Sequence, residues 1–351
     1  MNVIVIGDFL KDLDDEHTLC AAAQLYRQGV ISLRCVIGNL SPADLRARGA
    51  KGTLKQLGLP SIPVGVGMAV YEGDTYPYET EVPYLAESHE VLPDGHQLLV
   101  NTLEGCPDKS VTLVLQSGLT DAAQLLRSHE GLCIDKLTQV AIMGGVELDE
   151  TGSVKLDEAG LMIPNNANNN TFDMESANWL YRQLQVLGIP MVITTRDAAY
   201  SAQVPFSMYD ALEDTGNPVG ACLRGRQMPS LQKLWQAACS PSGSDIRGTL
   251  PNDRNRGWFI NVFCNGDDPG IEDGSDIWPY VGSFNLYDPI SFIAAIPALR
   301  SSFFNPHVVK VGQTTHIVIG MSRDDHNIKD VDALRQFMMN IEVEALKAAI
   351  S

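Results

Sequence analysis

The chain has 351 residues, of which 44% are hydrophobic and 19% are charged, and its formal net charge is −18. This composition is ordinary for a chain that buries a core, and we expect a single globular domain over residues 1–351. The negative charge would repel polynucleotides and anionic lipids, so we expect neither a nucleic-acid nor a membrane partner. The seven cysteines include no CxxC pair. They predict reduced thiols, and without a signal-peptide pattern they favour a cytoplasmic location.

The first 66 residues predict alternating strands and helices. Val3 to Ile6 is a short run of β-branched residues, which is typical of a buried parallel strand. A helix should open at Asp14 and end near Gly29, because apolar residues recur there at helical spacing. Strands over residues 31–37 and 62–66 then flank a helix that Ser41 should cap, with Pro42 in its first turn, and that runs to about residue 57.

The rest of the chain continues the same pattern. Residues 68–95 look like a surface excursion, and further strands are expected at 111–115, 139–143 and 189–194, with helices near 120–128 and 174–184. Residues 200–285 predict helices and loops that cover the carboxyl edge of the sheet, followed by a helix at 290–299. A hairpin at 308–319 and a closing helix at 331–350 complete the pattern. We therefore predict an α/β fold with a doubly wound, mostly parallel open sheet.

Four carboxylates lie between the first strand and the first helix. Asp8, Asp12, Asp14 and Asp15 fall within eight residues, at the position where open α/β sheets bind their ligands. A helix N-terminus stabilises such charges by only about 0.3–1 kcal/mol each, which is less than their mutual repulsion. A bound cation is the simplest explanation, and oxygen ligands suit Ca²⁺ or Mg²⁺. The alternative is a solvated acidic loop in which Asp14 caps the helix.

Polar segments also follow the later strands. Gly38-Asn39 follows the second strand, Gln116 to Asp121 follows the strand at 111–115, and Met143-Gly144-Gly145 ends the strand at 139–143. The segment from Asn165 to Asp173 contains five asparagines in six positions. Carboxamides both donate and accept hydrogen bonds, as sugar hydroxyls require, although such a tract can also be an exposed loop.

In order and spacing, these segments resemble the inosine-uridine nucleoside hydrolase family, whose first strand is followed by Asp-x-Asp-x-x-x-Asp-Asp. Asp8, Asp14 and Asp15 match this signature, and the matches span most of residues 3 to 298. The resemblance implies a bound calcium held by Asp15, by Asp288 of the segment Tyr287-Asp288-Pro289, and by the Gln116 backbone carbonyl. Asp8 or Asp12 would complete the ligand set.

The resemblance also implies a ribose site. Asp14, Asn39, Asn169 and Asp288 would bind the sugar hydroxyls, and Met143 would pack on the sugar. Asp173 would cap the helix that follows the asparagine tract. Trp278, Tyr280 and Tyr287 are candidates for stacking on a base or donating a proton.

Three positions depart from the family pattern. Leu10 replaces the carboxylate that binds calcium and is thought to take a proton from water, Ala167 replaces a ribose-binding glutamate, and Tyr287 replaces a histidine thought to assist the departing base. Asp12 stands where the family has glycine. We therefore predict that Asp12 takes over the lost role as metal ligand or base, with Asp8 as the second candidate.

The sequence thus predicts a calcium-dependent hydrolase that cleaves the N-glycosidic bond of a ribonucleoside or related ribosyl compound. Two other functions stay open: a noncatalytic protein that binds ribosyl compounds and metal, and a metal-dependent phosphatase. Members of the family are usually dimers or tetramers, so the resemblance implies a homodimer or homotetramer.

Overall fold

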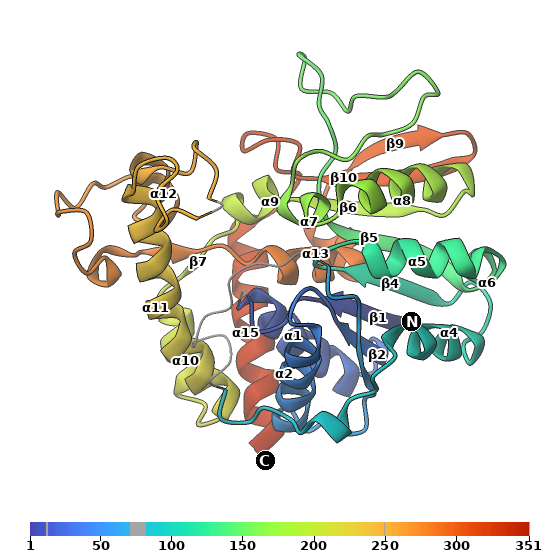
Figure 1. Cartoon of the computed structure of the whole chain (residues 1–351), viewed down its shortest axis with the longest axis horizontal. Helices are drawn as coiled ribbons and strands as arrows, with labels where there is room; N and C mark the ends of the chain where they lie inside the picture. The colour runs from blue at the N-terminus through green and yellow to red at the C-terminus, as the bar shows by residue number, and fades with distance from the viewer. Residues whose placement is uncertain (12, 71–81, 249, 351) are drawn as a thin grey trace.

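A computed structural model describes residues 1–11, 13–70, 82–248 and 250–350, so Asp12 lies outside the described residues. Eight strands form one sheet in the order β3-β2-β1-β4-β5-β6-β10-β9 (Figure 1). The strands are β1 (Asn2–Gly7), β2 (Ser32–Gly38), β3 (Val64–Val66), β4 (Val111–Leu115), β5 (Leu137–Gly144), β6 (Met191–Thr195), β9 (His307–Val311) and β10 (Thr314–Ile319). Neighbouring strands are parallel except in the antiparallel hairpin of β9 and β10.

The order of the strands reverses between β1 and β4. From β1 the chain proceeds outward to β2 and β3, and then returns to the other side of β1 to add β4, β5 and β6. A crevice for ligands forms at the carboxyl ends of the two strands that flank such a reversal. The structure confirms the predicted doubly wound α/β fold, and it places this reversal at the strand that precedes the acidic loop.

Helices cover both faces of the sheet because each central strand is apolar on both sides. Along β1, Val3 and Val5 pack into one core cluster, whereas Ile4 and Ile6 pack into another on the opposite face. The first face is covered by α1 (Asp14–Arg27), α2 (Ala43–Gln56), α13 (Tyr287–Ala295) and α15 (Val331–Ile350), and the second by α4 (Gly95–Glu104), α5 (Thr120–Ser128), α6 (Glu130–Lys136) and α8 (Met174–Val186). That residues 1–351 form one domain stays a prediction.

Residues between β6 and α13 form a separate layer of helices beside the sheet. Helices α10 (Ser207–Glu213), α11 (Pro218–Cys239) and α12 (Arg256–Phe263) stand together on the left of Figure 1. Strands β7 (Val204–Pro205) and β8 (Ser283–Phe284) form a small antiparallel pair that starts and ends this layer. The buried Trp235 of α11 packs against Phe259 of α12, with ring centroids 5.2 Å apart.

Several elements differ from the sequence-based expectation. Helices α4 and α6 were not anticipated, and the segment expected as a single helix over 290–299 is divided. Helix α13 ends at Ala295 and α14 (Pro297–Phe303) begins two residues later. The division falls at Pro297, because proline has no N–H for the helical hydrogen bond and is favoured in the first turn of a new helix.

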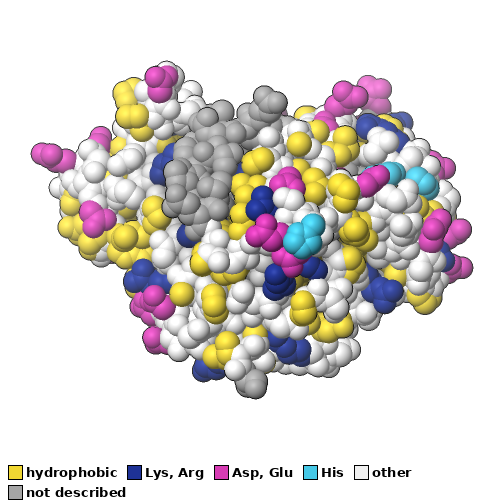
Figure 2. Space-filling view, turned by 60° about the horizontal axis from the view of Figure 1, so that its bottom comes forward, with side chains coloured by type: hydrophobic (Ala, Val, Ile, Leu, Met, Phe, Trp, Pro, Cys, Tyr) yellow, Lys and Arg dark blue, Asp and Glu magenta, His cyan; other side chains and the backbone are white. Residues whose placement is uncertain are grey.

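Among the described residues, no helix is both long and apolar enough to cross a membrane. Figure 2 shows one face of the surface, on which acidic and basic side chains are interspersed. The negative net charge is therefore not gathered into one patch on that face.

Candidate functional site

Three carboxylates meet beside the carboxyl end of β1. Oxygen atoms of Asp14, Asp15 and Asp288 all lie within 4.8 Å of one another, and all three residues are buried. Asp14 and Asp15 open α1, which follows β1, whereas Asp288 lies in the first turn of α13. The topology thus brings together three of the carboxylates that the sequence predicted for the site.

Asp15 is the most enclosed member of this cluster. It is 1% exposed, and neither of its carboxylate oxygens has a hydrogen-bond partner among the described residues. Burial, together with the charges of Asp288, Asp8, Asp14 and Glu16, raises the pKa of Asp15 well above its usual value. A bound cation would reverse this effect, because it would compensate the charges and coordinate the unpartnered oxygens.

The end of β1 is shaped to receive the Asp15 carboxylate. A Cβ atom at Gly7 would overlap Asp15 Oδ1, so only glycine leaves room for this side chain beside the strand. The buried, all-oxygen donor set fits a hard divalent cation such as Ca²⁺.

Asp14 connects the acidic loop to α13. Its Oδ2 atom accepts the backbone N–H groups of Tyr287 at 3.2 Å and Asp288 at 3.3 Å. Free N–H groups at the start of a helix need such an acceptor. The alternative interpretation of the loop required Asp14 to cap α1, its own helix. Asp14 instead accepts the free N–H groups in the first turn of α13.

Gln116 fixes the position of Asp288 from the other side. Its Nε2 atom donates to the Asp288 carbonyl oxygen at 2.6 Å and to Thr18 Oγ1 at 3.1 Å. Gln116 directly follows β4, the strand beside β1 at the reversal of the sheet. The predicted metal ligand at this position was the backbone carbonyl, and that role stays a prediction.

Asp8 also lies near Asp15, since its charge contributes to the raised pKa of that residue. The Asp8 carboxylate is 3.8 Å from Lys11 Nζ, and the same ammonium group lies 4.7 Å from the centre of the Phe172 ring. Phe172 belongs to the segment from Asn165 to Asp173 that contains the asparagine tract, so this contact joins that segment to the acidic loop. The predicted roles of Asp8 and Asp12 in metal binding and catalysis stay predictions.

Leu10 does not face the carboxylates, because the turn around it is held in one orientation. Its φ is 72°, an uncommon value for leucine, and its side chain packs against Gly49 of α2. The Leu10 N–H donates to Glu16 Oε1 at 3.0 Å, and its carbonyl accepts Arg226 Nη2 at 2.9 Å. Both partners are buried charged groups.

Asn39 lies at the end of β2 and is fully buried. Its Nδ2 atom donates to the Gly118 carbonyl at 3.0 Å and to Asp121 Oδ2 at 2.9 Å, and its Oδ1 atom accepts the Ser117 hydroxyl. The carboxamide thus binds the loop that follows β4, and a ribose contact from it stays a prediction.

The asparagine tract lies against the end of β5. Asn169, in the short helix α7 (Asn168–Thr171), donates from Nδ2 to the Met143 carbonyl at 3.0 Å and remains partly exposed. The predicted cap is confirmed, because Asp173 accepts the Ser176 N–H at 3.0 Å at the start of α8. Asn169 and Met143 thus lie together, as a common sugar site requires.

The aromatic candidates lie in different surroundings. Tyr287 meets Tyr200 of α9 (Arg196–Ser201) edge to face, with ring centroids 6.0 Å apart. Burial, and then the neighbouring Tyr200, raise the pKa of Tyr287 well above its usual value. Trp278, in the 3₁₀ helix η2 (Trp278–Tyr280), packs instead against Phe206 at 4.9 Å, and Tyr280 is 45% exposed.

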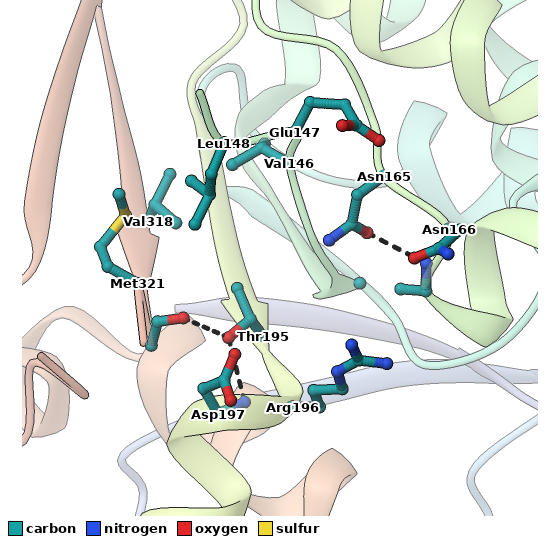
Figure 3. A pocket seen from close by; sticks show the side chains of 13 residues that line it. Val146, Glu147, Leu148, Asn165, Asn166, Thr195, Arg196, Asp197, Val318 and Met321 are labelled. Carbon is teal, nitrogen blue, oxygen red and sulfur yellow. Dashed lines mark hydrogen bonds between the residues drawn. The ribbon is translucent and has the colours of Figure 1, made fainter. Parts of the chain in front are cut away.

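A cavity of about 350 Å³ opens at the carboxyl ends of β5, β6 and β10. Figure 3 shows Asn165 and Asn166 on one side of it and Leu148, Val318 and Met321 on the other. Its floor includes Thr195, Arg196 and Asp197, which sequence reasoning missed. The signal was available: these polar residues directly follow a predicted strand, at the same edge as the other site residues.

Comparison with solved structures shows that the fold is nucleoside hydrolase-like. No protein-family model matches the chain, and no curated protein matches it either. Several solved structures match the chain. A purine-preferring ribonucleoside hydrolase from Gardnerella vaginalis is 14% identical, with a TM-score of 0.60, and the alignment covers 99% of this chain and 100% of that one. At that identity the likeness shows the fold alone.

The structures of two effector proteins are more similar to this chain. The type III effector protein XopQ, solved in complex with adenosine diphosphate ribose, is 29% identical with a TM-score of 0.83, covering 99% of this chain and 94% of that chain. The effector protein XOO4466 is 28% identical with a TM-score of 0.79, covering 98% and 93%. These similarities extend over nearly the full length of the chain.

Proposed function

We propose that this protein is a calcium-dependent hydrolase that cleaves the N-glycosidic bond of a ribosyl compound. The observation that carries the proposal is the cluster of Asp14, Asp15 and Asp288 at the strand reversal. The fold shared with nucleoside hydrolases, and the ADP-ribose bound to the similar effector XopQ, support a ribosyl ligand.

Asp15 and Asp288 would hold the calcium, with the Gln116 carbonyl and a carboxylate of Asp8 or Asp12. A calcium ion held there would supply activation of a water molecule, because a bound divalent cation lowers the pKa of water. Asp14 keeps Asp288 in place through the backbone bonds described above. These contacts between α1 and α13 thereby orient the carboxylates that would hold the calcium.

The sugar would lie between this cluster and the asparagine tract. Asn169, Asn39, Asp14 and Asp288 would bind its hydroxyls, with Met143 against the ring. Such contacts accelerate cleavage where they strengthen as positive charge develops on the sugar. Tyr287 would donate a hydrogen bond from its hydroxyl group to the leaving group.

A second candidate function is noncatalytic binding of a ribosyl compound and metal. It is favoured by Leu10, which faces α2 where the family has its proposed base, and by Asn39, whose carboxamide is engaged within the protein. Both candidates predict binding, and only the hydrolase predicts release of free ribose.

The test is to incubate purified protein with a panel of purine and pyrimidine nucleosides, with calcium or with EDTA, and to measure free ribose. We expect release that requires calcium and that disappears in Asp15→Asn. Calcium-dependent ligand binding without ribose release would select the noncatalytic function, whereas the absence of both binding and release with the nucleosides and with ADP-ribose would reject the ribosyl site. The predicted homodimer or homotetramer can be tested by light scattering on the same samples.

A further inference from the structure

Three arginines surround α9, although they come from separate parts of the chain. Arg196 is the first residue of α9 and lines the cavity, Arg254 precedes α12, and Arg323 follows β10. Arg254 Nη1 donates to the Tyr200 hydroxyl at 3.0 Å, and the Arg323 guanidinium lies 4.8 Å from the centre of the Tyr200 ring. Tyr200 thus brings two of the guanidinium groups to one place.

Asp197 lies among these three arginines. Burial raises the pKa of Asp197, while Arg196, Arg323 and Arg254 all act to lower it, so the three guanidinium groups act on one carboxylate. None of the three forms an ion pair with a described carboxylate. Three guanidinium groups gathered around Asp197, none of them in an ion pair among the described residues, can receive an anionic ligand.

The arginines are also close to the proposed ribose site. Tyr200 contacts Tyr287 with ring centroids 6.0 Å apart, and the Tyr287 N–H binds Asp14 Oδ2 at 3.2 Å. Helix α9 therefore contributes Asp197 to the cavity (Figure 3). It also contributes Tyr200, whose contacts lead through Tyr287 to Asp14. One helix thus connects the arginines with the acidic cluster.

We propose that the ribosyl ligand of this protein carries a phosphate or diphosphate group, which binds against Arg254 and Arg323 with Arg196 beside it. This inference rests on the proposed ribose site and specifies its substrate class. A guanidinium group can donate two parallel hydrogen bonds to a phosphate, and it can stack on an aromatic ring at the same time. An uncharged nucleoside would leave these groups without a function in binding.

The experiment compares the binding of adenosine, ADP and ADP-ribose by isothermal titration calorimetry in the presence of calcium. We expect the two phosphate-bearing ligands to bind at least about tenfold more tightly than adenosine, because charge-assisted hydrogen bonds are among the stronger polar contacts. Their affinity should fall as potassium chloride is raised, whereas that of adenosine should not.

Variants then assign the effect to the arginines. Arg323→Gln and Arg254→Gln should each weaken ADP binding by about tenfold and leave adenosine binding unchanged. Tyr200→Phe removes the hydroxyl that Arg254 contacts but no charge, so it should have a smaller effect than Arg254→Gln. Arg182→Gln is the matched control, since Arg182 is an exposed arginine on α8 whose Nη1 lies 3.4 Å from Asp157 Oδ2.

The possible results separate this proposal from the proposed function. If adenosine, ADP and ADP-ribose bind equally, or if the arginine variants weaken all three alike, the phosphate site is wrong while the ribose site stands. If none of the three binds in the presence of calcium, the ribose site is wrong and the phosphate site falls with it.

Discussion

Asp14 Oδ2 accepts the backbone N–H of Asp288 at 3.3 Å, although the two residues are 274 positions apart in the sequence. The same oxygen accepts the N–H of Tyr287, so one carboxylate from the first helix satisfies the first turn of α13. The cluster is therefore held together by a backbone contact as well as by any ion that it binds. This contact distinguishes the role of Asp14 from that of Asp15.

Asp14→Ala should destabilise the protein by about 0.5–2 kcal/mol, the usual effect of losing a helix cap. It should also lower calcium affinity, because Asp288 loses the contact that positions it. Thermal unfolding and calcium titration of the same variant measure the two effects. Asp173→Ala is the control, since it removes the cap of α8. Equal losses of calcium affinity in both variants would contradict this role for Asp14.

Asp15→Asn should have opposite effects with and without calcium. Without the ion, the variant should be more stable than the wild type, because burial and neighbouring charges disfavour the ionised Asp15 carboxylate. With saturating calcium the order should reverse, because an ion that binds only the folded state stabilises it. Melting temperatures in EDTA and in calcium test this crossing. If the same protein, variant or wild type, has the higher melting temperature both in EDTA and in calcium, Asp15 is not a metal ligand.

Asp12→Asn tests whether this residue replaces the carboxylate that is absent at position 10. The change keeps size and shape but removes charge. We expect a loss of kcat, of calcium affinity, or of both, and a weaker effect from Asp8→Asn. Nucleoside hydrolysis and calcium binding that are both intact in Asp12→Asn would show that Asp12 has no such role.

Asn169→Ala should reduce kcat/KM by about 10²-fold, which corresponds to roughly 3 kcal/mol of lost transition-state contact. The neighbouring Asn168→Ala is a suitable control, because Asn168 is exposed in the same short helix. Steady-state kinetics of both variants provide the comparison. A similar loss in both would point to disruption of the helix instead of a sugar contact.

His316 predicts a pH dependence of stability that is independent of the site. This buried residue of β10 accepts the Met191 N–H at 3.2 Å, and burial lowers its pKa from 6.5 to about 4. Between these pH values the unfolded chain binds more protons than the folded one, so stability should fall as the pH decreases from 6.5 to 4. His316→Gln keeps an acceptor without this titration. Its unfolding free energy should decline less over that range, and an identical decline would contradict the assignment.

The sequence was sufficient to predict the sheet and the approach of the site segments to one another. The central strands are predominantly apolar, and the carboxyl ends of parallel strands share one edge, so Asp15, Asn39 and Gln116 were expected to lie near each other. Asp288 could be added only through the family resemblance, since its position depends on how α13 packs. Local signals such as Ser41-Pro42 located the helices to within a few residues, and α2 begins at Ala43 with Pro42 instead of Ser41 at its N-cap position.

The direction of individual side chains could not be predicted in this way. Leu10 is turned toward α2 by a hydrogen bond from Arg226, which is 216 residues away. The arginines around α9 come from three segments without any common motif, so no local pattern announces their convergence. Such contacts depend on tertiary packing between distant segments, which periodicity and spacing do not encode.

The fixed turn at Leu10 also limits what an acidic substitution at this position can do. An aspartate introduced at position 10 would point at Gly49, in a buried position beside α2, while Glu16 and Arg226 continued to hold the backbone in place. Several coordinated substitutions would be needed to turn such a carboxylate toward Asp15, because neighbouring sites in contact do not act independently. A carboxylate introduced elsewhere in the loop would not meet this obstacle.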